Sequence, residues 1–137
     1  MRIYFSGSIR GGRSCEDVYL KIINCLKKYG EVLTEHVGRK ETSYLGEKGM
    51  SDEDIYNRDI SLIKEADVLV AEVSTPSLGV GYEIAKAEEL GKSILCLYDA
   101  DNKNVSAMVK GNKNILLKEY CSSEELCEHI DNYFNKL

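Results

Sequence analysis

The feature that most constrains the fold of this chain is a regular alternation between short apolar runs and longer segments whose apolar residues recur at helical spacing. The run ADVLVAEV (66–73) has the length and continuity of a buried strand, and the segment 79–90 after it repeats like a helix that ends at Gly91. The segment 15–29 repeats in the same way and is expected to end at Gly30. Strands that alternate with helices form a parallel sheet covered on both faces, so we predict an α/β fold.

The same pattern predicts the order of the elements along the chain. The strands are expected over 2–7, 31–37, 67–73, 92–98 and 114–120, and the helices over 15–29, 52–65, 79–90 and from 122 onward, with a short helical or turn segment near 105–110. Ser51 with Asp54 and Ser122 with Glu125 have the spacing of helix-capping pairs. No repeat or linker divides the 137 residues. We therefore expect one Rossmann-like, flavodoxin-like domain over 1–137, with five parallel strands in the order 2-1-3-4-5 and helices on both faces.

That strand order places the topological switch point between the first and third strands, where open α/β sheets bind ligands. The loop after the first strand, GSIRGGR (7–13), combines glycines with the hydroxyl of Ser8 and the guanidinium groups of Arg10 and Arg13. Glycines let backbone amides approach an anion closely, and arginine clamps a phosphate through two hydrogen bonds. The spacing is not that of a Walker A loop, and a plain glycine-rich turn explains this stretch about equally well.

The loop after the third strand, STPSLGVGYE (74–83), raises a similar question. Ser77, Gly79 and Gly81 offer a hydroxyl and amides at the start of a helix, and Glu83 lies just beyond them. One interpretation makes Glu83 a first-turn acid that complements the helix dipole. The other makes it a functional carboxylate, because glycines lower helix propensity and the close passage of a ligand would explain them.

Two further residues are candidates for the same site. Asp59 falls within the apolar stripe of the helix 52–65, and an acid on an inward stripe needs a partner or a function. Pairing with Arg58 or Lys64 at the rim of the sheet is the structural alternative. Tyr4 is either a core residue, as is usual in a strand, or a hydroxyl that orients a carboxylate. Two acids without a metal motif suggest glycosyl transfer, with one acid as nucleophile and the other handling protons.

Composition narrows the partners and the compartment. A net charge of −5 disfavours nucleic acid and anionic membranes as partners. No apolar run reaches transmembrane length, and the first residues enter a strand with no signal peptide. The five cysteines form no C-x-x-C pair and are interpreted as reduced thiols in a cytoplasmic protein. The chain has only two histidines, which are too few to indicate a structural zinc site, so we expect no metal and no cofactor.

Four stretches together resemble the 2′-deoxynucleoside 5′-phosphate N-hydrolases of the nucleoside 2-deoxyribosyltransferase superfamily. They are YFSGSIRGG (4–12), VLTEHV (32–37), RDISLIKEADVLVAEVSTPSLGVGYEIAKAEELGKSILCL (58–97) and SAMVKG (106–111). The similarity runs nearly end to end and is weakest in 39–50 and the last helix. It implies an enzyme that cleaves the N-glycosidic bond of a deoxynucleoside monophosphate through a covalent glycosyl-enzyme, releasing base and 2-deoxyribose 5-phosphate.

The resemblance also implies roles for individual residues. By position, Glu83 matches the nucleophile that attacks C1′, Asp59 the acid that contacts the sugar and assists proton transfer, and Tyr4 the tyrosine oriented toward the nucleophile. The implied phosphate-binding residues are Gly7, Ser8, Ile9, Arg10, Gly11, Ser77 and Gly79. Ser106 and Met108 match a segment contributed by the second subunit of a homodimer. A nucleoside 2-deoxyribosyltransferase and a non-catalytic nucleotide-binding sensor are the alternative functions.

Overall fold

A five-stranded parallel sheet forms the centre of the molecule. The computed structural model describes residues 1–9, 16–35, 49–102 and 104–137. The strands are β1 (Arg2–Ser6), β2 (Glu31–Val32), β3 (Val68–Glu72), β4 (Ser93–Asp99) and β5 (Leu116–Tyr120), in the order β2-β1-β3-β4-β5. All neighbouring pairs are parallel. The predicted fold class and strand order are therefore confirmed. No helix within the described ranges is long and apolar enough to cross a membrane.

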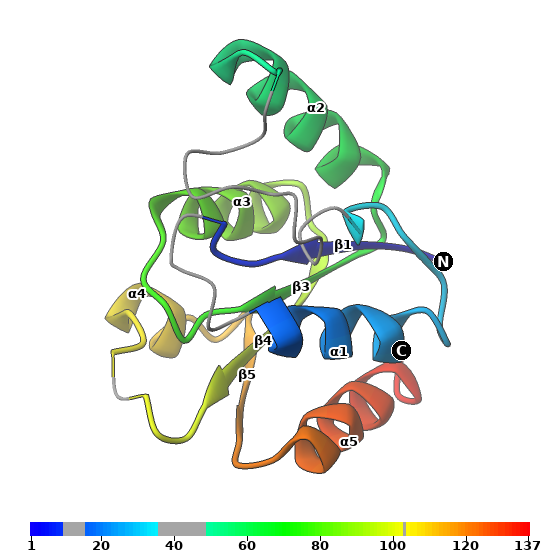
Figure 1. The fold of residues 1–137 in the computed structure, drawn as a ribbon, viewed down its shortest axis with the longest axis vertical. Helices are drawn as coiled ribbons and strands as arrows, with labels where there is room; N and C mark the ends of the chain where they lie inside the picture. Colours follow the sequence, from blue (N-terminus) through cyan, green and yellow to red (C-terminus); the bar gives the residue numbers. More distant parts are fainter. Residues whose placement is uncertain (10–15, 36–48, 103) are drawn as a thin grey trace.

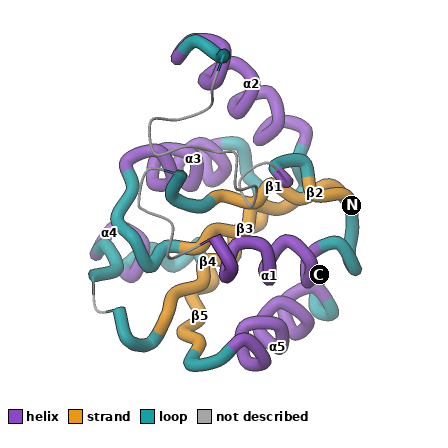
Figure 2. Tube along the Cα trace, viewed as in Figure 1, coloured by secondary structure: helices purple, strands orange, loops and turns teal. Residues whose placement is uncertain are grey.

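Helices cover both faces of this sheet (Figure 1). They are α1 (Glu16–Leu26), α2 (Asp52–Glu65), α3 (Leu78–Glu89), α4 (Ala107–Lys110) and α5 (Ser123–Phe134). Figure 2 shows the strands lying between a layer that holds α1 and α5 and another that holds α2 and α3. Each layer has its own apolar core: Phe5 and Leu126 belong to the first, and Tyr4 and Ile84 to the second. Successive residues of β1 thus face opposite cores, because side chains alternate along a strand.

The predicted helix boundaries that depend on local hydrogen bonds are confirmed. Ser51 and Asp54 form a reciprocal capping box at the start of α2. The Glu125 amide donates to Ser122 Oγ at 3.2 Å at the start of α5. Gly91 has a φ of 71°, the left-handed conformation in which glycine ends a helix. These signals succeed because a cap depends on residues three or four positions apart, which a sequence displays directly.

The second strand and the first helix are shorter than predicted. β2 pairs with β1 only at Glu31 and Val32, whereas a strand was expected over 31–37. Beyond Val32, the side chain of Thr34 takes the place of backbone hydrogen bonds between β2 and β1. Its Oγ1 accepts from the Phe5 amide at 2.7 Å and donates to the Phe5 carbonyl at 2.6 Å. α1 ends at Leu26 rather than near Gly30, so the glycine lies beyond the helix it was expected to end.

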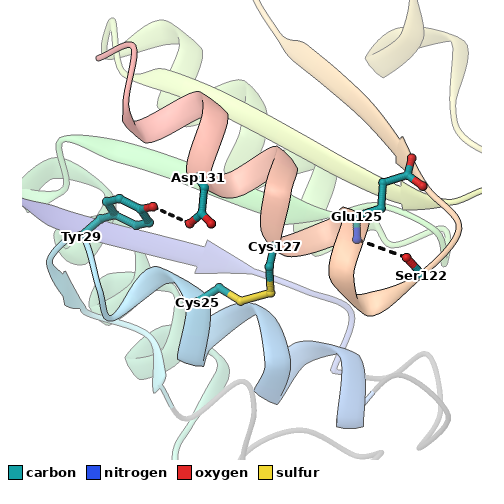
Figure 3. Close-up of a disulfide and its surroundings, with 6 residues drawn as sticks. All are labelled: Cys25, Tyr29, Ser122, Glu125, Cys127 and Asp131. Atoms are coloured by element: carbon teal, nitrogen blue, oxygen red, sulfur yellow. Dashed lines mark hydrogen bonds between the residues drawn. A yellow bond between two sulfur atoms is a disulfide. The ribbon is translucent and has the colours of Figure 1, made fainter.

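The expectation that all five cysteines are reduced is wrong for two of them. Cys25 of α1 and Cys127 of α5 form a disulfide, with their Cα atoms 6.1 Å apart (Figure 3). Nearby, Tyr29 in the turn after α1 donates a hydrogen bond to Asp131 of α5. The two cysteines are 102 residues apart in sequence. Their proximity follows from the packing of two helices on the same face of the sheet, which spacing along the chain does not reveal.

Candidate active site

The centre of the candidate site lies on the α2–α3 face of β1. Tyr4 and Ser6 share that face because they are two residues apart in a strand. β3 pairs alongside, with Tyr4 opposite Leu69 and Ser6 opposite Ala71. Both β1 side chains are buried, at 2% and 1% exposure. Two hydroxyls are thereby held rigidly beneath the helices that cover this face.

α3 places Glu83 above these hydroxyls. Ser77 is the N-cap of α3, and its Oγ accepts from the Val80 amide at 3.2 Å. The first turn of α3 contains no acidic residue, because Glu83 lies one turn beyond Val80. Glu83 is partly buried and follows the inward stripe of Val80 and Ile84. The interpretation of Glu83 as a first-turn acid that complements the helix dipole is therefore wrong.

The environment of Glu83 changes its acidity. Burial raises the pKa of the Glu83 carboxyl to about 7, against a hydrogen bond from Tyr4 that lowers it. The Asp59 carboxylate raises this pKa further, whereas the Ser6 hydroxyl and the Arg58 guanidinium lower it. A carboxyl with a pKa near neutrality exchanges between its two states at physiological pH, as groups that take part in catalysis commonly do.

Tyr4 and Asp59 complete the cluster that the sequence predicts. Burial raises the pKa of Tyr4 well above its usual range, and the nearby Glu83 and Asp59 carboxylates raise it more. Asp59 also pairs with Arg58, whose Nε and Nη2 lie 2.9 and 2.8 Å from Asp59 Oδ1. The predicted structural alternative for Asp59, a pair with Arg58, therefore exists alongside its proximity to Glu83. Neither of these two contacts uses Oδ2.

The loop after β1 is described in part. The backbone amide of Ser8 donates to the Tyr19 hydroxyl at 2.9 Å, so a protein group already occupies this amide. A Cβ on Gly7 would lie 2.9 Å from the Tyr19 ring, which gives Gly7 a packing reason of its own. Ile9 lies in a partly buried bend. Arg10 and Gly11, both predicted to bind phosphate, lie outside the described residues, as does His36.

A second group of predicted residues lines a cavity of about 660 Å³ between α3 and α4. Ser77, Ser106 and Met108 contribute to its wall. Within the described residues, its lining does not include Glu83, Asp59 or Tyr4. Ser106 and Met108 were expected to act across a dimer interface, and that expectation stays a prediction. Gly79 and Gly81 have room for a Cβ, so protein packing does not require them to be glycine.

Sequence reasoning missed two side chains at this edge of the sheet. Ser6 lies near Glu83, and the alternation Tyr4-x-Ser6 was the available signal for it. Glu72, at the end of β3, is 3% exposed and accepts hydrogen bonds from Ser74 and the Tyr120 hydroxyl. Glu72 lies in an apolar run, and its burial was not predicted because no local pattern indicates that Tyr120, 48 residues away, is its partner.

The fold and this cluster define a class of protein: an α/β domain that presents two carboxylates and a buried tyrosine beside the switch point of its sheet. This arrangement suits displacement at a sugar carbon without a metal. Comparison with known proteins identifies the family. The model of the nucleoside 2-deoxyribosyltransferase family matches residues 3–125, and the chain belongs to this family.

The similarity to these known proteins extends over nearly the whole chain. A protein provisionally named 2′-deoxynucleoside 5′-phosphate N-hydrolase 1 from Nematostella vectensis is 48% identical over 142 residues, which covers 99% of this chain and 95% of the relative. The 5-hydroxymethyl-dUMP N-hydrolase of Esox lucius is 44% identical over 143 residues, covering 100% and 98%.

Solved structures share the fold at lower identity. The CMP N-glycosidase BcmB of Clostridium botulinum has a TM-score of 0.70 and 22% identity, and the comparison covers 97% of this chain and 99% of that one. The solution structure of BlsM has a TM-score of 0.77 and 23% identity, covering 98% and 90%. At these identities the two structures bear on the fold alone.

Proposed function

We propose that this protein hydrolyses the N-glycosidic bond of 2′-deoxynucleoside 5′-monophosphates, releasing the free base and 2-deoxyribose 5-phosphate. The observation that carries the proposal is the convergence of Glu83, Asp59 and Tyr4 from three separate elements. A sensor that only binds nucleotide has no need for two carboxylates at one place. The relatives named as N-hydrolases of deoxynucleoside monophosphates support the substrate class.

Glu83 is the proposed nucleophile. Its carboxylate attacks C1′ of the sugar while the bond from C1′ to the base breaks, and the bonding electrons leave with the base, which takes up a proton. Water then attacks C1′ of the glycosyl ester, loses a proton, and releases the Glu83 carboxylate. Partial burial supports this role, because a poorly solvated carboxylate is a better nucleophile than one surrounded by water.

Asp59 and Tyr4 have supporting roles in this reaction. Tyr4 donates to Glu83 and orients the carboxylate. Asp59 is proposed to contact the sugar and to assist proton transfer, with its position held by Arg58. A 2′-hydroxyl would withdraw electrons from the positively charged transition state next to the nucleophile, so we propose a preference for deoxyribose over ribose.

The 5′-phosphate is proposed to bind where the loop after β1 meets the start of α3. Ser77 supports this, because its Oγ accepts the Val80 amide and its hydroxyl hydrogen remains able to donate to an anion. The N-terminus of α3 adds positive potential there. The remaining proposed contacts come from Gly7, Ser8, Ile9, Arg10, Gly11 and Gly79.

The enzyme is proposed to act as a homodimer in which Ser106 and Met108 reach the partner's site. Leu78 is 97% exposed and Met108 is 83% exposed, both beside the cavity between α3 and α4. Apolar side chains exposed around a cavity favour burial by another protein surface. A second copy would also bring Ser106 toward a phosphate, which explains why this residue lies outside the cluster around Glu83.

The cytoplasm is the proposed compartment. Nucleoside monophosphates carry charge and do not cross membranes unaided, so their hydrolase acts where they are made. Disulfides are rare in the reducing cytosol, so the pair Cys25 and Cys127 gives a reason to test the compartment directly. Cell fractionation should recover the protein with cytoplasmic markers, and recovery with secreted or periplasmic material would contradict the proposal. Thiol alkylation at the moment of lysis will show the redox state of the pair.

One experiment tests the reaction. The purified protein is incubated with a panel of deoxy- and ribonucleoside monophosphates and with the corresponding unphosphorylated nucleosides, and released base is quantified. We expect base from deoxynucleoside monophosphates and not from the unphosphorylated nucleosides, because loss of the Arg10 contact alone should lower kcat/KM by about 1–2 decades. Base exchange between nucleosides without hydrolysis would support a transferase, and binding without release would support a sensor. Equal kcat/KM for deoxy- and ribonucleotides would reject the sugar preference.

A further inference from the structure

Ser6 has a feature that the proposed reaction does not yet use. It is the last residue of β1 and is 1% exposed. Within the described residues, Ser6 Oγ is a buried polar atom with no hydrogen-bond partner. A buried hydroxyl without a partner is unfavourable and uncommon in native proteins, so such an atom at a ligand site calls for an explanation.

The surroundings of Ser6 indicate what its hydroxyl is for. Tyr4 and Ser6 share one face of β1, and Tyr4 belongs to the same apolar core as Ile84, the residue next to Glu83 on α3. Asp59 and Arg58 of α2 also act on the Glu83 carboxyl. Both β1 hydroxyls lie close enough to Glu83 to lower the pKa of its carboxyl, but Ser6 Oγ does not meet the geometry of a hydrogen bond to it in the described structure. A carboxylate has two oxygens and accepts several hydrogen bonds, so Glu83 has capacity for both donors.

We propose that Ser6 is a positioning residue for Glu83: its hydroxyl donates to the ionised carboxylate when Glu83 is in its reacting position. The proposal rests on the proposed role of Glu83 as nucleophile. With Tyr4 and Ser6 of β1 as two donors, both hydrogen bonds reach the Glu83 carboxylate from the sheet and fix the orientation of its plane. The Ser6 hydrogen bond favours the charged form of Glu83, which is the form that attacks C1′.

The consequence is a specific change in pH dependence. Loss of the Ser6 donor leaves the carboxylate of Glu83 less stabilised against protonation. In Ser6→Ala, the acidic limb of kcat/KM is therefore expected to move to higher pH by about 0.5–1 unit. At about pH 6 this corresponds to a fall of about three- to tenfold, and the rates of variant and wild type converge above the limb.

Stability separates this role from a structural one. The described structure gives Ser6 Oγ no partner to lose, so Ser6→Ala should keep or raise the melting temperature. Ser6→Cys retains a weak donor and is expected to give a limb between the other two. Ser123→Ala removes an exposed serine hydroxyl from the start of α5 and serves as the matched control, with an unchanged limb.

The experiment measures kcat/KM for base release between about pH 5 and 9, with melting temperatures, for wild type, Ser6→Ala, Ser6→Cys, Ser123→Ala and Glu83→Gln. An acidic limb that does not move in Ser6→Ala, whether or not the rate falls, overturns the proposal. Should Ser6→Ala fail to fold, an unmoved limb in Ser6→Cys overturns it as well. Activity retained in Glu83→Gln would instead refute the proposed nucleophile, an outcome that is distinguishable from failure at Ser6.

Discussion

At the scale of single residues, the proposed nucleophile Glu83 is also energetically unfavourable to the folded state when it is ionised. Burial raises the pKa of its carboxyl from 4.5 to about 7, so the folded protein holds this proton more tightly than the unfolded chain does. Glu72 is also buried with a raised pKa, yet hydrogen bonds from Ser74 and Tyr120 satisfy it within the protein. The difference suggests that Glu72 ties β3 to β5, whereas Glu83 is left available for a substrate.

Glu83→Gln should therefore lose activity and gain stability. We expect base release to fall by at least about a thousandfold, because an amide does not replace a carboxylate nucleophile. The sign of the stability change follows from the raised pKa: ionised Glu83 is unfavourable in the folded state, by an amount that grows from about pH 4.5 to 7 and vanishes below. The variant should melt at a higher temperature than wild type at about pH 8, and at the same temperature at about pH 4.5.

Glu89→Gln is the matched control, because it makes the same change at an exposed position of α3. The measurements are steady-state base release and thermal unfolding at both pH values, with mass spectrometry of stopped wild-type turnover to detect a glycosyl adduct on Glu83. Activity within tenfold of wild type in Glu83→Gln, or no adduct under any quench, would count against the nucleophile. A melting temperature below wild type at both pH values would contradict the burial argument.

At the scale of elements, α1 and α5 are joined by more than apolar packing. The disulfide between Cys25 and Cys127 connects the two helices, and Tyr29 in the turn after α1 donates a hydrogen bond to Asp131 of α5 (Figure 3). A disulfide that closes a loop of this length stabilises a protein chiefly by restricting its unfolded chain. This layer lies on the opposite face of the sheet from Glu83, so it supports the sheet rather than the chemistry.

Cys127→Ser is expected to lower the free energy of unfolding by about 2–4 kcal/mol under oxidising conditions. After reduction of both proteins, the difference in the free energy of unfolding should shrink to the effect of replacing the partly buried Cys127 thiol by a hydroxyl. Urea denaturation with and without reductant measures both states. Cys121→Ser, at an exposed free cysteine, should change little. Equal stability of oxidised wild type and Cys127→Ser would show that the disulfide does not contribute.

At the scale of the whole molecule, we propose that a second subunit brings Ser106 to the cluster around Glu83, because the lining of the cavity with Ser106 does not include that cluster within the described residues. Ser106 is the N-cap of α4, and its Oγ accepts the Met108 amide at 3.2 Å. Ser106→Asp keeps a side chain that caps helices but places a negative charge toward a phosphate, and Ser106→Asn is the neutral control with similar capping. We expect Ser106→Asp to lose most of its activity and Ser106→Asn to keep more.

Mixing then distinguishes the two possible origins of Ser106. Each variant alone is expected to lose most of its activity, whereas a mixed dimer of the proposed kind has one site with an intact Glu83 from one chain and an intact Ser106 from the other. With random assembly, about one quarter of all sites should regain activity. No recovery after subunit exchange would place Ser106 in its own chain's site. Met108→Glu should lower the mass measured by sedimentation and the activity together, and a fully active monomer would reject the dimer.

The sequence by itself determined the order of the elements and the parallel sheet, because hydrophobic period and capping residues are local signals. The strand order followed from the flavodoxin-like alternation of strands and helices. It also indicated Glu83, Asp59 and Tyr4, since an acid on an inward stripe and glycines before a helix are visible along the chain.

The contacts around these residues depend on packing. The tertiary structure brought Ser6 and Arg58 to Glu83, and it joined Cys25 to Cys127 across 102 residues. It also replaced the end of the second strand by the side chain of Thr34. Each of these depends on which helices share a face of the sheet, a long-range property that no local spacing encodes.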